Sequence, residues 1–250
     1  MTTIYAGLPF YSSTAKQEKN RSHNKIPFYC PTTHLPPFIL CDVMANVPTY
    51  AQYFLISCSE LEGGGTDISA YFATTPATVT TVDNFYIIYD GTALLTALPK
   101  GTYFIRADTS TGDSYYSEHF AVTGMTSGQW IKLEFSNTSD LGDIPYSEGA
   151  KQIVYLNTKM GYPANEYVET GVEKDGVFIA EKLVTKYLYR ISDYVGRALH
   201  RCLVRLPQHD TITITDEVGN TYSPAVGNAI LATSDWMAFE TCHIVIQFNE

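Results

Sequence analysis

The sequence predicts a mainly β protein that contains a small β-sandwich, an α+β domain and a single helix. Three observations predict this class. Short runs rich in Val, Ile, Thr, Tyr and Phe recur at close spacing. Turn-forming Gly, Asp and Asn separate these runs. Only one segment, near residues 192–206, has the 3.6-residue spacing of a helix that covers a core.

The composition favours a globular chain with an unusually neutral surface. Of the 250 residues, 45% are hydrophobic, which is enough to build a core. Only 17% are charged, against about 25% in typical soluble domains. Tyrosine occurs 19 times, and tyrosine supplies both contact area and a hydroxyl group. This combination is typical of a protein that other subunits cover.

The net charge argues against a protein that grips nucleic acid. The formal charge is −10, whereas binding to phosphates needs a surplus of Lys and Arg to displace counterions. A negative surface is compatible with a channel through which DNA slides without sticking.

The cysteines predict reduced thiols, because their number is odd at five and no CxxC pair occurs. We expect most of them to be small buried hydrophobic residues. The first residues lack a basic and then apolar signal pattern, and no apolar run has the length of a membrane span. We therefore expect assembly in a reducing cytoplasm.

Residues 1–48 predict an extended N-terminal arm. The stretch 16–25 is polar and without periodicity, and the following residues are rich in proline, which denies helix to the residue before it. Residues 1–26 are either a flexible terminus or a segment that becomes ordered only on a neighbour. If the arm crosses to a neighbouring subunit, deleting residues 1–26 weakens assembly more than it lowers the melting temperature.

Residues 49–124 predict a sandwich of the immunoglobulin or fibronectin III type. Strands are expected at 50–57, 67–74 and 78–91, and a hairpin at 101–122 ends the domain. In the first strand of this hairpin, Ile105 is expected to share a face with Tyr103 and Ala107. In the second strand, one face is expected to carry every other residue, namely Tyr115, Ser117, His119 and Ala121. The stretch 123–129 is expected to be a linker.

Residues 130–250 predict the α+β domain, with strands at 130–135, 152–156, 211–216 and 241–248. The helix is expected to begin at the N-cap Ser192 and to end before Pro207. Arg197, Arg201 and Arg205 follow one another at intervals of four. They form either a solvated face or a docking stripe for an acidic neighbouring subunit.

The sequence offers no convincing catalytic, cofactor or metal residues, so we expect a protein that is not an enzyme and needs no cofactor. Adjacent Cys242 and His243 point to opposite faces of a strand and cannot chelate one metal ion. His209-Asp210 is similar to the pair in HD-type hydrolases, but it opens a strand and lacks further ligands. We interpret it as a turn before a strand. We interpret the acidic cluster as a solvated turn, since it lacks the calcium-loop pattern; its members are Glu166, Glu169, Glu173 and Asp175.

The second half resembles virion proteins of Bacteroidetes-infecting, crAss-like phages. The resemblance covers roughly residues 100–250 and lies in the following stretches: Trp130 to Phe135, Asp140-Leu141-Gly142, Ile153 to Leu156, Glu173 to Gly176, His209 to Thr215, and the YYSEHFAV strand pair. It implies a component of the tail or the head-to-tail neck, such as a ring protein in the DNA conduit. No functional residues follow from it.

Three functional hypotheses result. The first is a non-enzymatic virion subunit in a cyclic homo-oligomer, which contacts neighbouring tail, portal or ring proteins and neither a membrane nor a specific nucleic-acid sequence. The alternative is a carbohydrate-binding or adhesion module of a phage tail or bacterial surface, which needs coplanar exposed aromatic rings. The third is a hydrolase that uses the acidic cluster or His209-Asp210.

Overall fold

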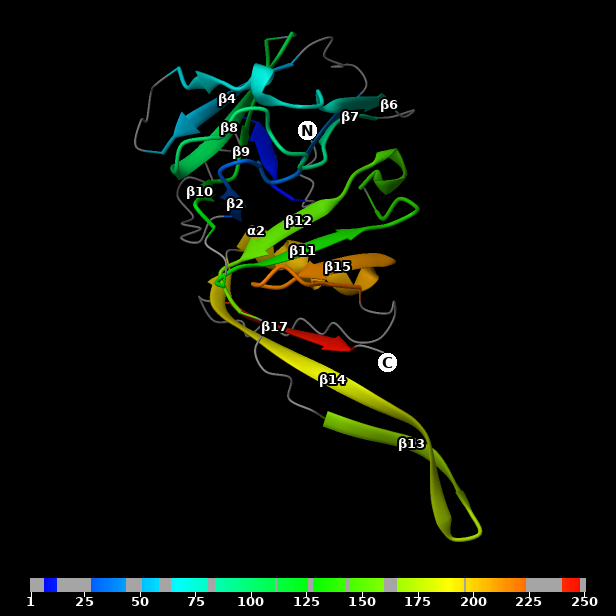
Figure 1. The fold of residues 1–250 in the computed structure, drawn as a ribbon. Coiled ribbons are helices and arrows are strands. Elements are labelled where there is room, and N and C mark those ends of the chain that lie inside the picture. The colour runs from blue at the N-terminus through cyan, green and yellow to red at the C-terminus, as the bar shows by residue number, and fades with distance from the viewer. Residues whose placement is uncertain are drawn as a thin grey trace.

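The computed structural model confirms the predicted fold class, since it is mainly β with a single described α-helix (Figure 1). Three sheets are present in the described part of the chain. The structure describes residues 7–12, 28–43, 51–58, 64–80, 84–110, 112–125, 128–142, 144–159, 166–195, 197–223 and 240–247.

The upper part of Figure 1 is a sandwich of two sheets. One sheet has the antiparallel order β3-β7-β6, and in the other β8 pairs with β4 on one side and with β9 and β10 on the other, while β5 pairs with the far edge of β4. This is the immunoglobulin arrangement. In its usual strand letters, β3, β7 and β6 correspond to B, E and D, and β5, β4, β8 and β9 correspond to C′, C, F and G. The bounds are β3 Phe38–Val43, β4 Ala51–Ser57, β5 Thr66–Asp67, β6 Ala77–Thr80, β7 Asn84–Tyr89, β8 Gly101–Thr109, β9 Ser114–Ser117 and β10 Phe120–Thr123.

The described residues of the predicted arm belong to this sandwich. β1 (Phe10–Ser12) pairs with β9, and β2 (Phe28–Pro31) runs parallel to β10. β3 is the first strand of the other sheet. The prediction of an arm that crosses to a neighbour is therefore wrong for these residues, and the sandwich begins well before residue 49. The reason is hydrophobic: Phe10 and Phe38 are 0% exposed within this chain.

A one-residue bulge lets the strand after β8 change partners. Tyr116 lies opposite Arg106, but Phe120 lies opposite Tyr103, so one extra residue sits between them. The buried face shifts accordingly from Tyr115 and Ser117 to Phe120 and Val122. The predicted uninterrupted alternation is therefore wrong beyond Ser117. After the bulge, the strand leaves β1 and joins β2.

The second half extends the sandwich's larger sheet without a break. β12 pairs with β2 through Tyr155 opposite Tyr29, and β11, β15 and β16 follow in order. Two side-chain contacts reinforce the junction: Lys151 lies 3.8 Å from the Asp90 carboxylate, and Trp130 packs edge-on against Tyr29. The predicted strands at 130–135, 152–156 and 211–216 are confirmed as β11 (Ile131–Ser136), β12 (Gln152–Leu156) and β15 (Thr211–Thr215), and β16 (Thr221–Tyr222) is a further strand that was not predicted.

Two strand predictions in the sandwich are wrong in detail. The segment 67–74 contains a 3-10 turn, η2 (Ser69–Tyr71), rather than a strand. The run 78–91 holds the antiparallel pair β6 and β7 rather than one strand. Further 3-10 turns are η3 (Tyr146–Glu148) and η4 (Leu206–Gln208).

The helix α2 (Arg197–Val204) is shorter than predicted, because residues up to Val195 belong to the strand β14 (Val177–Val195). The predicted N-cap Ser192 lies where the register of β14 against β17 (Glu240–Gln247) shifts. Pairing with β17 thus overrides the helical spacing that begins at Ile191. The predicted core face of the helix is confirmed where the side chains are described, at Leu199, Cys202, Leu203 and Leu206.

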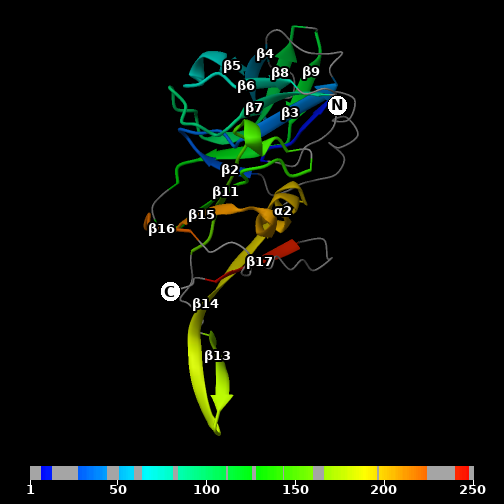
Figure 2. The ribbon, with the colours of Figure 1, turned by 90° about the vertical axis from the view of Figure 1, so that its right-hand side faces the viewer.

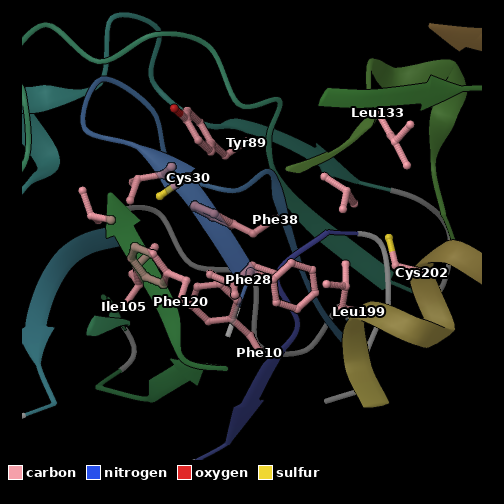
Figure 3. Packing of buried hydrophobic residues seen from close by; sticks show 14 of the residues in the cluster. Phe10, Phe28, Cys30, Phe38, Tyr89, Ile105, Phe120, Leu133, Leu199 and Cys202 are labelled. Atoms are coloured by element: carbon pink, nitrogen blue, oxygen red, sulfur yellow. The ribbon is translucent and has the colours of Figure 1, made fainter. Parts of the chain in front are cut away.

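One hydrophobic cluster joins the sandwich to the helix (Figure 3). Phe38 lies at its centre, with ring centroids 5.1 Å from Phe10 and 5.2 Å from Tyr89. The cluster continues through Leu133 to Leu199 and Cys202 of α2. The two predicted halves therefore share a core.

Candidate assembly surface

A long two-stranded ribbon stands out from the body of the molecule (Figures 1 and 2). It consists of β13 (Glu166–Lys174) and the first half of β14. A two-residue turn, Asp175-Gly176, joins the strands, with φ of 56° and 74°. Type I′ hairpins need positive φ at both positions, which Asp-Gly tolerates well. The acidic cluster that we predicted to be a solvated turn is thus spread along β13 and this turn, where Glu173 and Asp175 are exposed.

The ribbon is anchored at its base and open at its tip. β14 is the central strand, with β13 and β17 on opposite sides. β13 pairs with β14 from Val177 to Lys186, whereas β17 pairs with β14 from Lys186 to Val195. Each outer strand therefore covers about half of β14 among the described residues. A two-stranded ribbon has little stability of its own in water, so a projecting one is an element suited to a partner.

The tip of the ribbon exposes apolar side chains. Val172 is 53% exposed and Val177 is 63% exposed. Because Lys174 lies opposite Val177, Val172 is the diagonal neighbour of Val177 on the same face. Among the described residues, the other large hydrophobic side chains with comparable exposure are Leu95 and Val218, which lie elsewhere. The two valines thus lie exposed on one face of a ribbon tip that also exposes Glu173, Lys174 and Asp175.

The predicted arginine stripe lies at α2. Arg197 begins the helix and its side chain lies outside the described set, while Arg201 and Arg205 are half-buried. The helix packs against β17 and η4. The segment 196–209 contains no acidic residue, although Asp193 and Asp210 lie close to its two ends in the sequence.

A buried polar cluster holds α2 against the sheet. Gln152 is its hub: the side-chain amide donates to the Tyr146 hydroxyl and lies 3.3 Å from Nε2 of His209. The amide oxygen accepts from Cys202 Sγ at 2.5 Å. The His209 ring lies edge-on to Phe135 and to Tyr146. Sequence reasoning missed this cluster, because its members come from β12, α2, the 3-10 turn η3 and the residue that follows η4.

Burial governs the protonation of the cluster. It raises the pKa of the Cys202 thiol to about 12 and also raises the pKa of Tyr146. Burial likewise lowers the pKa of His209. Gln152 and Cys202 are 0% exposed and His209 is 2% exposed, so a substrate has no direct access to them. The cluster is suited to fixing the position of the helix.

The His209-Asp210 pair lies between the 3-10 turn η4 and the start of β15, as the interpretation of a turn before a strand predicted. Nδ1 of His209 lies 2.8 Å from the Arg205 carbonyl oxygen. The Asp210 carboxylate accepts from the backbone N–H and the hydroxyl of Thr138, and these hydrogen bonds lower the pKa of Asp210. Within the described residues, no group of three or more His, Cys, Asp or Glu side chains is placed to hold a metal ion.

The outer face of β4, β8 and β9 carries half-buried aromatic rings. The Phe104 ring is tilted by 50° from Tyr116 and by 64° from His119. The Arg106 guanidinium covers the Phe54 ring at 4.5 Å. These rings do not form the coplanar platform that the carbohydrate-binding hypothesis requires.

Comparisons with known proteins do not point to a function for this chain. No family model, curated protein or solved structure matches this chain. No helix in the described segments is both long and apolar enough to span a membrane. The molecule is thus defined as an immunoglobulin-like sandwich whose sheet continues into an α-helix-backed extension with a projecting ribbon.

Proposed function

We propose that the chain is a non-enzymatic structural subunit of a phage virion, which forms an oligomeric ring in the tail or the head-to-tail neck and part of the DNA conduit. The observation that carries this proposal is the projecting ribbon with exposed Val172 and Val177 at its tip. Contiguous exposed apolar groups mark surfaces that bind another protein, and these two valines are diagonal neighbours on one face of the ribbon.

Properties of the whole chain support the same role. Charged residues make up only 17% of the sequence and tyrosine occurs 19 times, which suits a surface covered by neighbouring copies. The net charge of −10 suits the wall of a channel that DNA must pass without binding. The resemblance of residues 100–250 to virion proteins of crAss-like phages points in the same direction.

Assembly of the purified chain tests the proposal. We expect native mass spectrometry to find a closed homo-oligomer and negative-stain microscopy to show rings. The double variant Val172→Asp/Val177→Asp places charges on the tip and is expected to shift the equilibrium towards monomer. Val218→Asp is the matched control, because Val218 is 72% exposed but lies in the β15–β16 turn.

Two results would contradict the proposal. One is a native chain that stays monomeric up to high concentration and is absent from purified virions. The other is an oligomer whose equilibrium with monomer is the same for the tip variant and for the control, which would mean that the ribbon tip does not contribute to assembly. Binding of the monomeric chain to a glycan array would instead support the carbohydrate-binding alternative.

A further inference from the structure

We propose that the ribbons of neighbouring copies join edge to edge, so that β14 of one copy pairs with β13 of the next and one antiparallel sheet runs around the oligomer. This inference rests on the proposed function and deepens it, because it names the backbone edges that meet. The occupant of each open edge is therefore a second copy of this chain.

Both strands of the ribbon have an open edge within the part of the chain that the structure describes. β13 pairs with β14 along one side only. β14 pairs with β17 from Lys186 onwards, which leaves residues 177–185 open on that side. Along such an edge, every second residue directs its backbone N–H and C=O outwards. The ribbon thus carries two templates for pairing with another chain.

The two open edges match in length and lie side by side in the ribbon. β13 has 9 residues. The open stretch of β14 runs from Val177 to the residue before Lys186, so it has the same length. β13 already lies alongside this stretch, on its other side. A copy that is rotated about a common axis can therefore place its β13 against the open β14 edge without sliding along the strands, as a closed ring requires.

The chain already contains the proposed pair of neighbours. Within one copy, β13 and β14 form an antiparallel ladder that ends with Lys174 opposite Val177. The contact between copies places the same two strands side by side in the same relative direction, through their other edges. β13 carries three glutamates and one lysine, whereas residues 177–186 carry one glutamate and two lysines. A contact between two β13 strands brings like charges together, and a contact between β13 and β14 avoids this.

A bulge in β14 favours a sheet that curves. The register shifts between Thr170 and Gly171, where β14 contains the additional residue Glu181. A bulge bends its strand and increases the local twist, and a sheet needs such bends to return on itself. A contact between two different edges is heterologous, so repeated copies can close into a ring. Closure of this sheet leaves none of the ribbon edges open.

A proline on either edge tests the contact in the full chain. With a two-residue turn, Lys174 and Val177 exchange their backbone hydrogen bonds, so the N–H groups of Glu173 and Ala180 point away from the ribbon's own ladder. Glu173→Pro removes an outward N–H from β13, and Ala180→Pro removes one from β14. Neither change removes a hydrogen bond within the hairpin. The matched controls Glu173→Gln and Ala180→Ser keep the N–H.

Mixing the two proline variants gives the most specific result. Each variant alone is expected to raise the monomer–oligomer midpoint by at least about tenfold in concentration, whereas the controls assemble like the native chain. Glu173→Pro still has its open β14 edge, and Ala180→Pro still has its open β13 edge. An equal mixture is therefore expected to form a heterodimer and no larger species, as measured by native mass spectrometry.

The outcomes separate this inference from the proposed function. If neither proline variant changes the midpoint, the edge contact is overturned, although the ring function stands. If only one variant changes it, the copies pair through like edges and the inference is wrong. A mixture without heterodimer overturns it as well.

Two further measurements keep the test decisive if a proline disturbs folding. Thermal melting of each proline variant beside its control identifies such a loss. Amide hydrogen exchange of the native chain needs no variant: the amides of Glu173 and Ala180 are expected to be protected in the oligomer and to exchange rapidly in the monomer. Equal exchange in both states overturns the edge contact. If the native chain is monomeric at every concentration, the proposed function itself fails.

Discussion

Ser117 provides a direct test of how the sandwich is built. Its hydroxyl fills the gap that the bulge leaves beside β8: it accepts from the backbone N–H of Ile105 at 2.8 Å and donates to the Glu118 carbonyl at 2.7 Å. Ile105 is 0% exposed and Ser117 is 2% exposed. The change Ser117→Ala therefore leaves a buried N–H without its acceptor.

The expected loss follows from these contacts. An unsatisfied buried backbone donor costs about 1–3 kcal/mol, so we expect unfolding free energy to fall by about 2 kcal/mol. For a chain of this size, that corresponds to a melting temperature lower by roughly 4–8 °C. Urea unfolding followed by tryptophan fluorescence measures the change, which is expected without a change in the m-value.

Ser114→Ala is the control for this prediction. The Ser114 hydroxyl is half-buried and donates to the Asp108 carboxylate at 2.7 Å. Its loss is expected to cost under about 1 kcal/mol, because water can replace the bond. If the two variants lose equal stability, or Ser117→Ala loses under about 0.5 kcal/mol, the role assigned to the bulge hydroxyl is wrong.

Three further predictions follow from the core and the buried polar cluster. Phe10→Ala is expected to lower the unfolding free energy by about 3–5 kcal/mol in urea titrations, and a loss under about 1 kcal/mol would mean that β1 does not belong to this chain's core. Gln152→Leu deprives Cys202 and Tyr146 of a partner and is expected to cost about 2 kcal/mol by the same assay, whereas an unchanged midpoint would remove the hub role. Burial lowers the pKa of His209 below its ordinary 6.5, so the unfolded state binds the proton first and stability is expected to fall as the pH drops below about 6.5. His209→Asn flattens this decline only in part, because the pKa of His34 is also lowered; an unchanged pH profile would contradict the assignment.

Many strands of the large sheet could be predicted from the sequence, because the alternation of buried and exposed residues along a strand is visible in the local sequence. Ile131, Leu133 and Phe135 are buried on alternate positions of β11, and Ile212 and Ile214 do the same on β15. Local spacing also located the core face of α2. What it could not supply was strand order, because the immunoglobulin arrangement depends on pairings between residues far apart, such as β4 with β8.

The proline-rich N-terminal segment shows a different limit. Prolines at 36 and 37 favoured an extended arm, and a strand does begin at Phe38, but the decisive feature is the apolar run from Phe38 to Cys41. Burial on both faces of a strand leaves no alternation to recognise. The run therefore belongs to the core rather than to an arm.

The candidate site was only half visible in the sequence. The arginines at intervals of four were identified, but the ribbon was not, although Asp175-Gly176 between strand-forming runs is a strong hairpin signal. The helical spacing that begins at Ile191 suggested a helix where the second half of β14 lies. The long-range pairing of β14 with β17 makes this segment a strand instead. The polar cluster around Gln152 had no local signal, because its members lie up to 63 residues apart.

The mass of the native assembly tests the central claim most directly. Native mass spectrometry across a range of protein concentrations, together with electron microscopy of the same sample, is expected to give a ring of one defined copy number. A chain that remains a single copy at every concentration, with its ribbon tip still accessible to a protease, would contradict the claim that this protein works as an assembled subunit.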